Sequence, residues 1–285
     1  MIAFFLGPAN TFSESAAAAL VPQGDRRPCP SFEAVVESVR LNPGSVGVLP
    51  YYNLLEGLVQ EGVDLIYEAG MSIRAAARIP VRFDLASPDG GHHHQQVFSH
   101  AKALAQCNDY LRNHLPNAEQ VAVASTAEAA RRVAEAGRGL AIAGRRAIES
   151  HGLKLVGEDI GNHRQGRCNY TDFLLISPNS GEPFPADVPC RTMLAVTPHE
   201  ERVGLLADIL RQFAYYGVNV AKIHSRPAID QVLLAIEPQM FYLELMARPQ
   251  DAHLQACLAA LRWRFEPARA GLDTIRVLGA WSEVG

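Results

Sequence analysis

Hydrophobic and polar positions along the first two thirds of the chain alternate in short runs that predict strands, each followed by an alanine-rich helical pattern. The runs at residues 2–6, 45–49 and 121–124 are typical of strands, and those at 13–20, 104–112 and 127–136 of helices. Strands that alternate with helices in this way favour an α/β fold with a mostly parallel sheet. The punctuated segment at residues 85–96 is interpreted as a crossover between two lobes.

The last third of the chain has a different pattern. Residues 193–197, 219–225, 240–246 and 274–278 read as strands, and residues 202–216 and 252–261 as helices. The order βαββαβ predicts a ferredoxin-like module. Between the two parts, residues 177–189 contain four prolines and one glycine, which forbid helix and interrupt strand pairing, so we interpret this stretch as a linker.

Composition narrows the class of protein. The chain has 285 residues, of which 48% are hydrophobic and 20% charged, and this is the composition of a globular protein of about two domains. A net charge of -4 gives no attraction for nucleic acid or anionic membrane. No apolar run reaches the length of about 18 residues that a spanning helix needs, so we expect a cytoplasmic protein. Five scattered cysteines predict reduced thiols.

Two polar segments follow predicted strands at the place where α/β proteins hold ligands. In the first, Thr11 or Ser13 can cap the helix that begins there, and the free N–H groups of that helix end favour an anion. In the second, Tyr52, Asn53 and Glu56 stand at a strand-to-helix turn. Each segment alone is also compatible with an ordinary cap or turn.

A third polar segment leads into an apolar strand. Asn169 and Thr171 alternate with other side chains at the start of this strand, and Arg164 and Arg167 precede it. Polar side chains that enter a buried strand cost free energy unless they are paired, so they indicate either a satisfied network or a site.

Together these three segments resemble the prephenate dehydratase family, whose patterns are GPxGTFS, IENSxEG and NxTRF. The residues that match these patterns are Gly7, Pro8, Thr11, Phe12, Ser13, Asn53, Glu56, Gly57, Asn169, Thr171 and Phe173. Residues 99–107 resemble the family's SHxQALAQC helix, and residues 125–130 its SxxxAA turn. The resemblance covers nearly the whole chain.

The resemblance implies a domain organisation and a site. Residues 1–180 would form a two-lobed, periplasmic-binding-protein-like catalytic domain, with lobes of about 1–82 plus 165–180, and 83–164. Residues 181–189 would be the linker and 190–285 an ACT domain. The predicted catalytic residues are Thr171, which matches the family pattern, and Asp172 and Tyr52, which depart from it. The implied substrate-binding residues are Thr11, Phe12, Ser13, Asn53, Glu56, Ser125, Thr126, Arg164, Arg167, Asn169 and Phe173. No cofactor and no metal are implied.

Several positions depart from the family patterns. Asp172 stands where TRF has its arginine, and Tyr52 where IENS has its glutamate. Asn10 replaces a glycine and Leu54 a serine. We expect all of these departures to line the cleft. An aspartate near a substrate carboxylate disfavours the ground state more than a transition state that has lost this charge.

These departures favour a lyase that decarboxylates prephenate and keeps the ring hydroxyl, as the related non-aromatising prephenate decarboxylases do. Tyr52, Tyr51 or His163 would then protonate a ring carbon. The alternative is ordinary prephenate dehydratase, which gives phenylpyruvate for phenylalanine biosynthesis. A second alternative is a catalytically silent ACT-domain sensor of an amino acid.

The resemblance also implies regulation through the ACT domain, whose GAL and ESRP patterns bind phenylalanine across a dimer. The corresponding residues here are Gly204, Leu205, His224, Ser225, Arg226 and Pro227. Leu205 in place of alanine is expected to fill the effector pocket, and His224 in place of the glutamate of ESRP cannot supply its negative charge. We therefore predict a homodimer or dimer of dimers in which phenylalanine is at most a weak effector.

One feature outside these patterns invites a metal interpretation. His92, His93 and His94 are consecutive, so they cannot all face one point, and no carboxylate is spaced to help them. The segment is therefore interpreted as a solvated loop.

Overall fold

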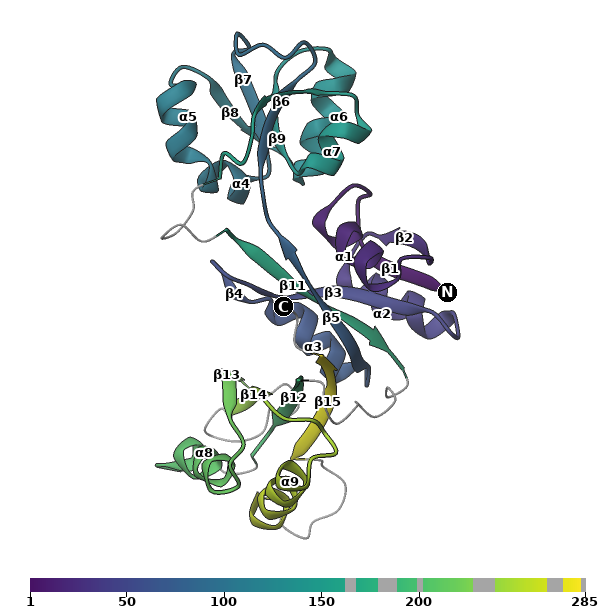
Figure 1. The fold of residues 1–285 in the computed structure, drawn as a ribbon, viewed down its shortest axis with the longest axis vertical. Coiled ribbons are helices and arrows are strands. Elements are labelled where there is room, and N and C mark those ends of the chain that lie inside the picture. The colour runs from purple at the N-terminus through teal and green to yellow at the C-terminus, as the bar shows by residue number, and fades with distance from the viewer. Residues whose placement is uncertain (162–167, 179–188, 199–201, 228–238, 266–273, 283–285) are drawn as a thin grey trace. The chain divides into compact units, whose positions relative to one another are not determined.

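A computed structural model describes residues 1–161, 168–178, 189–198, 202–227, 239–265 and 274–282 (Figure 1). The chain divides into two compact units, and each is described by itself. The first contains Met1–Val59 and Ala77–Phe173, and the second contains Gln60–Ala76 and Leu174–Gly285. Arg164, Arg167, His163 and most of the predicted linker lie outside the described residues.

One lobe of the first unit is built on parallel strands. Strand β1 (Ile2–Leu6) pairs with β2 (Asp25–Cys29) on one side and with β3 (Val46–Asn53) on the other. Helices α1 (Phe12–Leu20) and α2 (Phe32–Leu41) pack against β1 and β3. Beyond β3 come the parts of β11 (Tyr170–Ser177) and β5 (Ser72–Pro80) that belong to the first unit, which are Tyr170–Phe173 and Ala77–Pro80. The short β4 (Gly57–Leu58) forms a hairpin with β3.

The other lobe of the first unit is a separate five-stranded sheet with the order β10-β6-β9-β7-β8. Its strands are β6 (Asp84–Ser87), β7 (Gln96–Ser99), β8 (Glu119–Ala122), β9 (Leu140–Ala143) and β10 (Lys154–Gly157). Its helices are α4 (Ala101–Gln106), α5 (Asn108–His114), α6 (Thr126–Ala136) and α7 (Arg145–Ser150). Residues 85–96 join β6 to β7 within this sheet, so the predicted crossover at this segment is wrong.

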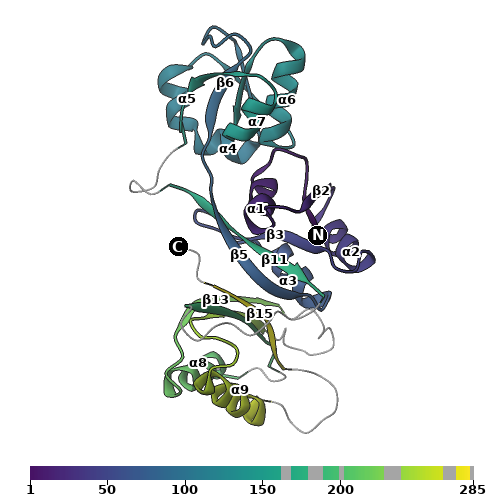
Figure 2. The same ribbon diagram turned by 45° about the vertical axis from the view of Figure 1, so that its right-hand side comes forward.

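Side-chain size on the central strand β9 explains why helices cover both faces of this sheet. Leu140 and Ile142 point into a core shared with α4 and α5, whereas Ala141 and Ala143 face the core of α6 and α7. The period of two along a strand produces this division, and the two alanines allow the alanine-rich α6 to approach closely. Figures 1 and 2 show the two helix pairs on opposite sides of the sheet.

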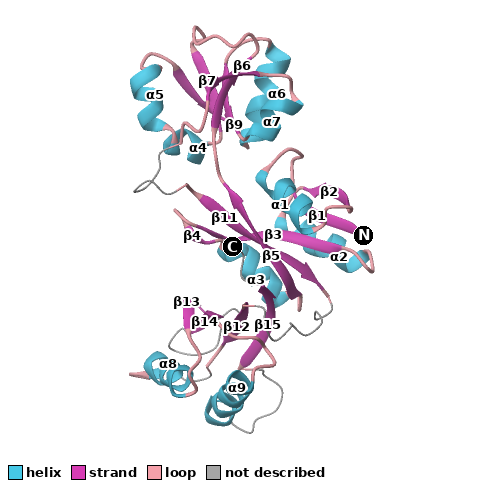
Figure 3. Cartoon of the chain, in the orientation of Figure 1, coloured by secondary structure: helices cyan, strands magenta, loops and turns pink. Residues whose placement is uncertain are grey.

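The C-terminal part of the second unit has the predicted order βαββαβ (Figure 3). Its elements are β12 (Cys190–Val196), α8 (Leu205–Tyr215), β13 (Val220–Pro227), β14 (Gln239–Leu245), α9 (Ala252–Phe265) and β15 (Ile275–Ser282). The strands pair antiparallel in the order β13-β14-β12-β15. This arrangement confirms the ferredoxin-like module.

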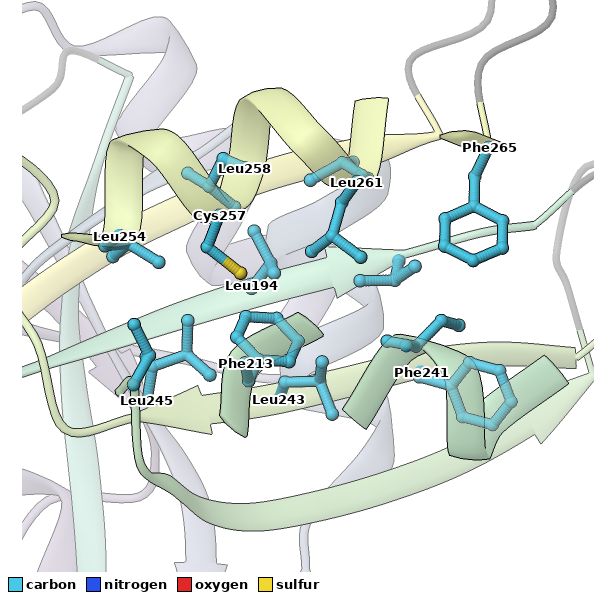
Figure 4. Packing of buried hydrophobic residues seen from close by; sticks show 14 of the residues in the cluster. Leu194, Phe213, Phe241, Leu243, Leu245, Leu254, Cys257, Leu258, Leu261 and Phe265 are labelled. Atoms are coloured by element: carbon cyan, nitrogen blue, oxygen red, sulfur yellow. The ribbon is translucent and has the colours of Figure 1, made fainter. Parts of the chain in front are cut away.

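Apolar side chains from α8 and α9 pack together on one face of this sheet (Figure 4). Phe213 of α8 and Leu258 of α9 meet Leu194 and Leu243 of the two central strands. Removing this many large side chains from water is the main source of stability for the module.

Helix α3 (Gln60–Glu68) belongs to the second unit, although it lies in the first third of the sequence. The Tyr242 hydroxyl donates to Asp64 Oδ1 at 2.9 Å, and Arg226 forms an ion pair with the same carboxylate. Arg276 Nη1 donates to the Tyr67 carbonyl at 2.8 Å. Contacts of this kind between distant segments group α3 with the C-terminal strands. The predicted domain boundary near residue 180 divides the sequence and not these contact-based units, and it stays a prediction.

Candidate active site

A cavity of about 340 Å³ lies within the first unit and is lined from both of its lobes. Residues from all three polar segments line it, together with side chains of the second lobe, although the matching residues Pro8 and Gly57 do not. The lining includes Thr11, Phe12, Ser13, Asn53, Glu56, Val81, Phe83, His100, Lys102, Gln106, Ser125, Thr126, Asn169, Thr171 and Phe173. Residues that are far apart in the sequence and were selected by the family patterns therefore lie in one cavity.

The central contact of the cavity joins β3 to β11. The Asn53 amide nitrogen donates to Thr171 Oγ1 at 2.9 Å and to the Tyr170 carbonyl at 3.1 Å. Both side chains are buried, with 9% of each residue exposed. Because the Thr171 oxygen already accepts a hydrogen bond from Asn53, its own O–H remains available as a donor.

The turn after β3 fixes which way the Asn53 amide points. Its Oδ1 accepts from the backbone N–H groups of Leu55 at 3.0 Å and Glu56 at 3.2 Å, so its NH₂ group faces Thr171. Gly57, opposite Asn53 in the hairpin, has φ +83°, a conformation that glycine adopts without strain. This explains in physical terms why the pattern requires a glycine after the glutamate.

Two helix N-termini border the cavity. Thr11 is the N-cap of α1, and its hydroxyl donates to the Pro8 carbonyl at 3.0 Å. Ser125 is the N-cap of α6, and its hydroxyl accepts from the Glu128 N–H at 3.0 Å. First-turn N–H groups have no partner within their helix, so both ends favour a negatively charged ligand.

Asn169 offers the cavity an unused acceptor. Its Nδ2 donates to Gln106 Oε1 at 3.3 Å. Its Oδ1 is buried and finds no hydrogen-bond partner among the described residues. Because an unsatisfied buried acceptor costs roughly 1–3 kcal/mol, a ligand hydroxyl that donates to it would bind favourably.

Charged side chains also reach the cavity. Lys102 Nζ lies 2.5 Å from Glu56 Oε2, and this ion pair connects α4 of one lobe with the β3–β4 turn of the other. His100 caps α4 through its Nδ1, which accepts from the Lys102 N–H at 3.3 Å. Lys102 is a cavity residue that the motif match does not predict, although it stands inside the SHxQALAQC match at the position of the first glutamine.

Asp172 does not face this cavity, so its predicted catalytic position is wrong. Thr171 and Phe173 line the cavity, and strand alternation turns Asp172 between them to the opposite side. There its carboxylate forms two hydrogen bonds with Arg78 of β5, at 2.7 and 3.0 Å. Hydrogen bonding to Asp172 raises the pKa of Arg78, whose guanidinium lies 3.9 Å from the ring centroid of Tyr170.

The other departures from the family patterns are also structural. Tyr52 pairs with Leu58 in the β3–β4 hairpin and is absent from the cavity lining, so the cavity gives no support to its predicted catalytic role. Asn10 has φ +64°, and asparagine is the residue after glycine that tolerates this region best. Leu54 donates its N–H to the Tyr170 carbonyl at 3.0 Å. The expectation that all departures line the cleft is therefore wrong.

A second hollow of about 820 Å³ adjoins the cavity and shares Leu6, Gly7, Ala124 and Ser125 with it. Pro8, Pro28 and Pro30 contribute to its wall. It is larger than the first cavity, but it lacks Asn53, Thr171 and Asn169, so the first cavity is the better candidate for chemistry.

The residues predicted to bind an effector lie on α8 and β13 of the second unit. Gly204 is the N-cap of α8, with φ +83°. Leu205 is 3% exposed and belongs to the hydrophobic core, so the expectation that it fills an effector pocket is wrong. On β13, Ser225 and Pro227 are exposed, and Arg226 pairs with Asp64. Burial lowers the pKa of His224, and the charge of Lys222 lowers it further.

The loop with three histidines does contain a nearby carboxylate, contrary to the prediction. Asp89 lies 3.2 Å from His93 Nε2 and 3.0 Å from His94 Nε2. The Gly139 N–H, however, donates to His94 Nδ1 at 3.2 Å, so this nitrogen carries no proton. An imidazole that bound a metal through Nε2 would carry its proton on Nδ1, so this hydrogen bond argues against a metal at His94. A hydrogen bond from the Gly91 N–H is the main cause that lowers the pKa of Asp89.

Other features agree with the sequence analysis. All five cysteines are free, and burial raises the pKa of Cys107 to about 12, as expected of an inert thiol. No helix in the described part of the chain is long and apolar enough to cross a membrane.

The fold and the cavity define a two-lobed α/β protein with a polar cavity that is lined from both lobes. The sequence model of the prephenate dehydratase family matches residues 3–181. A bifunctional chorismate mutase/prephenate dehydratase of Neisseria gonorrhoeae is 33% identical over 262 residues, which cover 90% of this chain and 69% of that protein. The chain therefore belongs to the prephenate dehydratase family and is an enzyme.

Solved structures agree on the fold. Prephenate dehydratase from Arthrobacter aurescens, in complex with L-Phe, superposes with a TM-score of 0.81 at 29% identity, over 99% of this chain and 90% of that one. A structure described as a quorum quenching acylase superposes with a TM-score of 0.82 at 23% identity, over 99% of this chain and 97% of that one. At 23% identity, the similarity to the acylase structure concerns the fold alone. The reaction therefore has to be inferred from the residues of the site.

Proposed function

We propose that the protein is a prephenate dehydratase, which converts prephenate to phenylpyruvate, CO₂ and water. The single observation that carries this proposal is the buried hydrogen bond from Asn53 to Thr171. It occupies the oxygen of the threonine and directs its O–H toward a ligand in the cavity. The cavity volume of about 340 Å³ lies within the range for small-molecule sites.

The reaction needs a donor at one end of the substrate ring. The C–C bond to the ring carboxylate breaks, and its electron pair enters the ring and makes it aromatic. The C–O bond of the ring hydroxyl breaks at the opposite carbon, and the departing oxygen takes up a proton to leave as water. The Thr171 O–H would donate to this oxygen as negative charge develops on it, which is where a positioned donor accelerates the reaction.

The remaining lining residues suit a substrate with two carboxylates and a hydroxyl. The N-terminal turns of α1 and α6 favour the negative charges, and Asn169 Oδ1 can accept a hydrogen bond from the ring hydroxyl in the bound substrate. Phe12 and Phe83, in edge-to-face contact at 5.9 Å between ring centroids, supply apolar surface for the ring.

We prefer dehydration over decarboxylation with a retained hydroxyl because the two residues that favoured decarboxylation, Asp172 and Tyr52, do not line the cavity. Asp172 is neutralised by Arg78 on the other side of the sheet, and Tyr52 does not line the cavity. A silent sensor is disfavoured because a site without chemistry has no need to desolvate so many polar groups.

We also propose that the C-terminal module, as an ACT domain, binds an aromatic amino acid as a regulator. The relative from Arthrobacter aurescens was solved with L-Phe, and Leu205 here packs into the core rather than into a ligand pocket. The size of Leu205 is therefore no reason to expect weak phenylalanine binding, whereas His224 in place of the glutamate of ESRP still is. The predicted homodimer or dimer of dimers stays a prediction.

Incubation of the purified protein with prephenate at neutral pH tests the proposal. Phenylpyruvate should accumulate in proportion to enzyme, well above a sample without enzyme, and its mass should lack the ring hydroxyl. The Thr171→Ala variant is the matched control, and it should be nearly inactive. A product that keeps the hydroxyl, or no turnover, would refute dehydration.

A further inference from the structure

We propose that Lys102 binds the side-chain carboxylate of the substrate, the carboxylate that survives in the product. This inference rests on the proposed function and adds a residue to its site. Lys102 Nζ lies at the cavity, 2.5 Å from Glu56 Oε2, and the side chains of the two residues are 65% and 40% exposed. Because the Lys102 ammonium group is so exposed to solvent, it can exchange one carboxylate partner for another at little cost in free energy.

Charge balance favours this exchange. Prephenate carries two carboxylates, and Glu56 adds a third negative charge to the cavity. Among the lining residues that the structure describes, Lys102 is the sole lysine or arginine. A substrate carboxylate that enters beside Glu56 is repelled by Glu56 and attracted by Lys102, so it gains most by lying next to Lys102.

The chemistry decides which carboxylate Lys102 holds. The ring carboxylate loses its charge as CO₂ departs, so a cation beside it would stabilise the ground state more than the transition state and slow the reaction. The side-chain carboxylate keeps its charge throughout. A cation beside that group strengthens the binding of substrate and transition state equally, so it lowers KM and leaves kcat nearly unchanged.

The local structure positions Lys102 for this contact. It is the second residue of α4, whose N-cap His100 accepts the Lys102 N–H and fixes the start of the helix. Its partner Glu56 lies three residues after Asn53, whose side chain accepts the Glu56 N–H at 3.2 Å. The cation therefore faces the same turn that orients Thr171. The family pattern has glutamine at the position of Lys102, and glutamine can donate a hydrogen bond but supplies no charge.

Three variants test the assignment. Lys102→Gln removes the charge and restores the residue of the family pattern, Lys102→Arg keeps the charge, and Lys154→Gln removes an exposed lysine of β10 that does not line the cavity. For each, kcat and KM are measured with prephenate, and calorimetry gives Kd for phenylpyruvate, which retains only the side-chain carboxylate.

We expect Lys102→Gln to raise KM for prephenate and Kd for phenylpyruvate by about tenfold each, the lower end for a hydrogen bond to a charged group, with kcat within about threefold of wild type. Lys154→Gln should stay within about threefold of wild type on every constant. Lys102→Arg, which keeps the charge, should recover most of the KM and Kd that Lys102→Gln loses. An increase for prephenate alone would assign Lys102 to the ring carboxylate and overturn the proposal, as would unchanged constants for both ligands.

The two proposals can fail separately. Wild-type protein that makes phenylpyruvate while Lys102→Gln matches it in KM and Kd would refute the role of Lys102 and leave dehydration intact. Wild-type protein that binds phenylpyruvate but does not form it, with weaker binding in Lys102→Gln, would refute dehydration and leave the carboxylate site intact.

Discussion

The Asn53 amide donates a hydrogen bond of 2.9 Å to the hydroxyl oxygen of Thr171, across the junction of strands β3 and β11. The two residues are separated by 118 positions in the sequence. Because Asn53 Oδ1 is held by two backbone N–H groups of its own turn, the amide cannot rotate without breaking them. The hydroxyl proton of Thr171 is thereby left for a ligand.

The variant Asn53→Asp tests this orientation. A carboxylate at this position still accepts the turn N–H groups, but it also accepts the Thr171 proton and so diverts it from the substrate. We expect kcat for phenylpyruvate formation to fall about 100-fold or more, as for removal of a positioned donor. We also expect Tm to fall, because the new carboxylate faces the Tyr170 carbonyl to which the Asn53 amide donates.

Thr171→Ser is the conservative control for that experiment. Serine keeps the hydroxyl, so its kcat should lie within about tenfold of wild type, whereas Thr171→Ala should be as impaired as Asn53→Asp. An Asn53→Asp variant with normal kcat would show that the orientation of Thr171 does not govern the reaction.

The pair between Asp172 and Arg78 predicts a structural role for Asp172. Its side chain is 4% exposed, so Asp172→Asn leaves Arg78 with a weaker partner in a partly buried position and should lower the free energy of unfolding by about 2–3 kcal/mol. The product formed from prephenate should not change. Denaturant unfolding and product analysis measure the two effects.

Asp25→Asn serves as the matched control, because Asp25 pairs with Arg27 at 2.9 Å on the surface, with side chains 59% and 55% exposed. It should cost less than about 1 kcal/mol. Asp172→Arg, which restores the residue of the family pattern, would place a second cation beside Arg78 and should destabilise the fold rather than create a substrate-binding group. A changed product from Asp172→Asn would return Asp172 to the site.

Leu205 predicts a stability effect rather than an effector effect. Leu205→Ala empties part of the core formed by α8, α9 and the sheet, and it should lower the free energy of unfolding by about 2–5 kcal/mol. Val203→Ala, at a fully exposed neighbouring position, should change it by less than about 0.5 kcal/mol. Tighter phenylalanine binding by Leu205→Ala without loss of stability would contradict the placement of Leu205 in the core.

Elements with a strong hydrophobic period could be predicted from the sequence. The buried strand β1 and the alanine-rich helices α1 and α6 were found nearly in full. Strand β2 could not be found, because its sequence Asp25–Cys29 contains three charged residues and a proline and pairs with β1 in spite of them. The predicted helix at residues 104–112 divides at Cys107 into α4 and α5.

The residues of the candidate site that match sequence motifs could be predicted. The prediction failed for Asp172, whose direction depends on the geometry of strand β11. Asp172 lies between Thr171 and Phe173 in one strand, so the period of two already implied that it faces away from them. Lys102 was missed because its partner Glu56 belongs to the other lobe and is 46 positions distant, and local patterns do not reveal such contacts.

The most direct measurement for the central claim is the product balance of a single reaction with prephenate, in which CO₂ release and phenylpyruvate formation are quantified together. The arrangement of Asn53 and Thr171 predicts one phenylpyruvate for each CO₂ released, and both yields should fall together in Asn53→Asp. CO₂ released without phenylpyruvate, with the ring hydroxyl still on the product, would contradict the account.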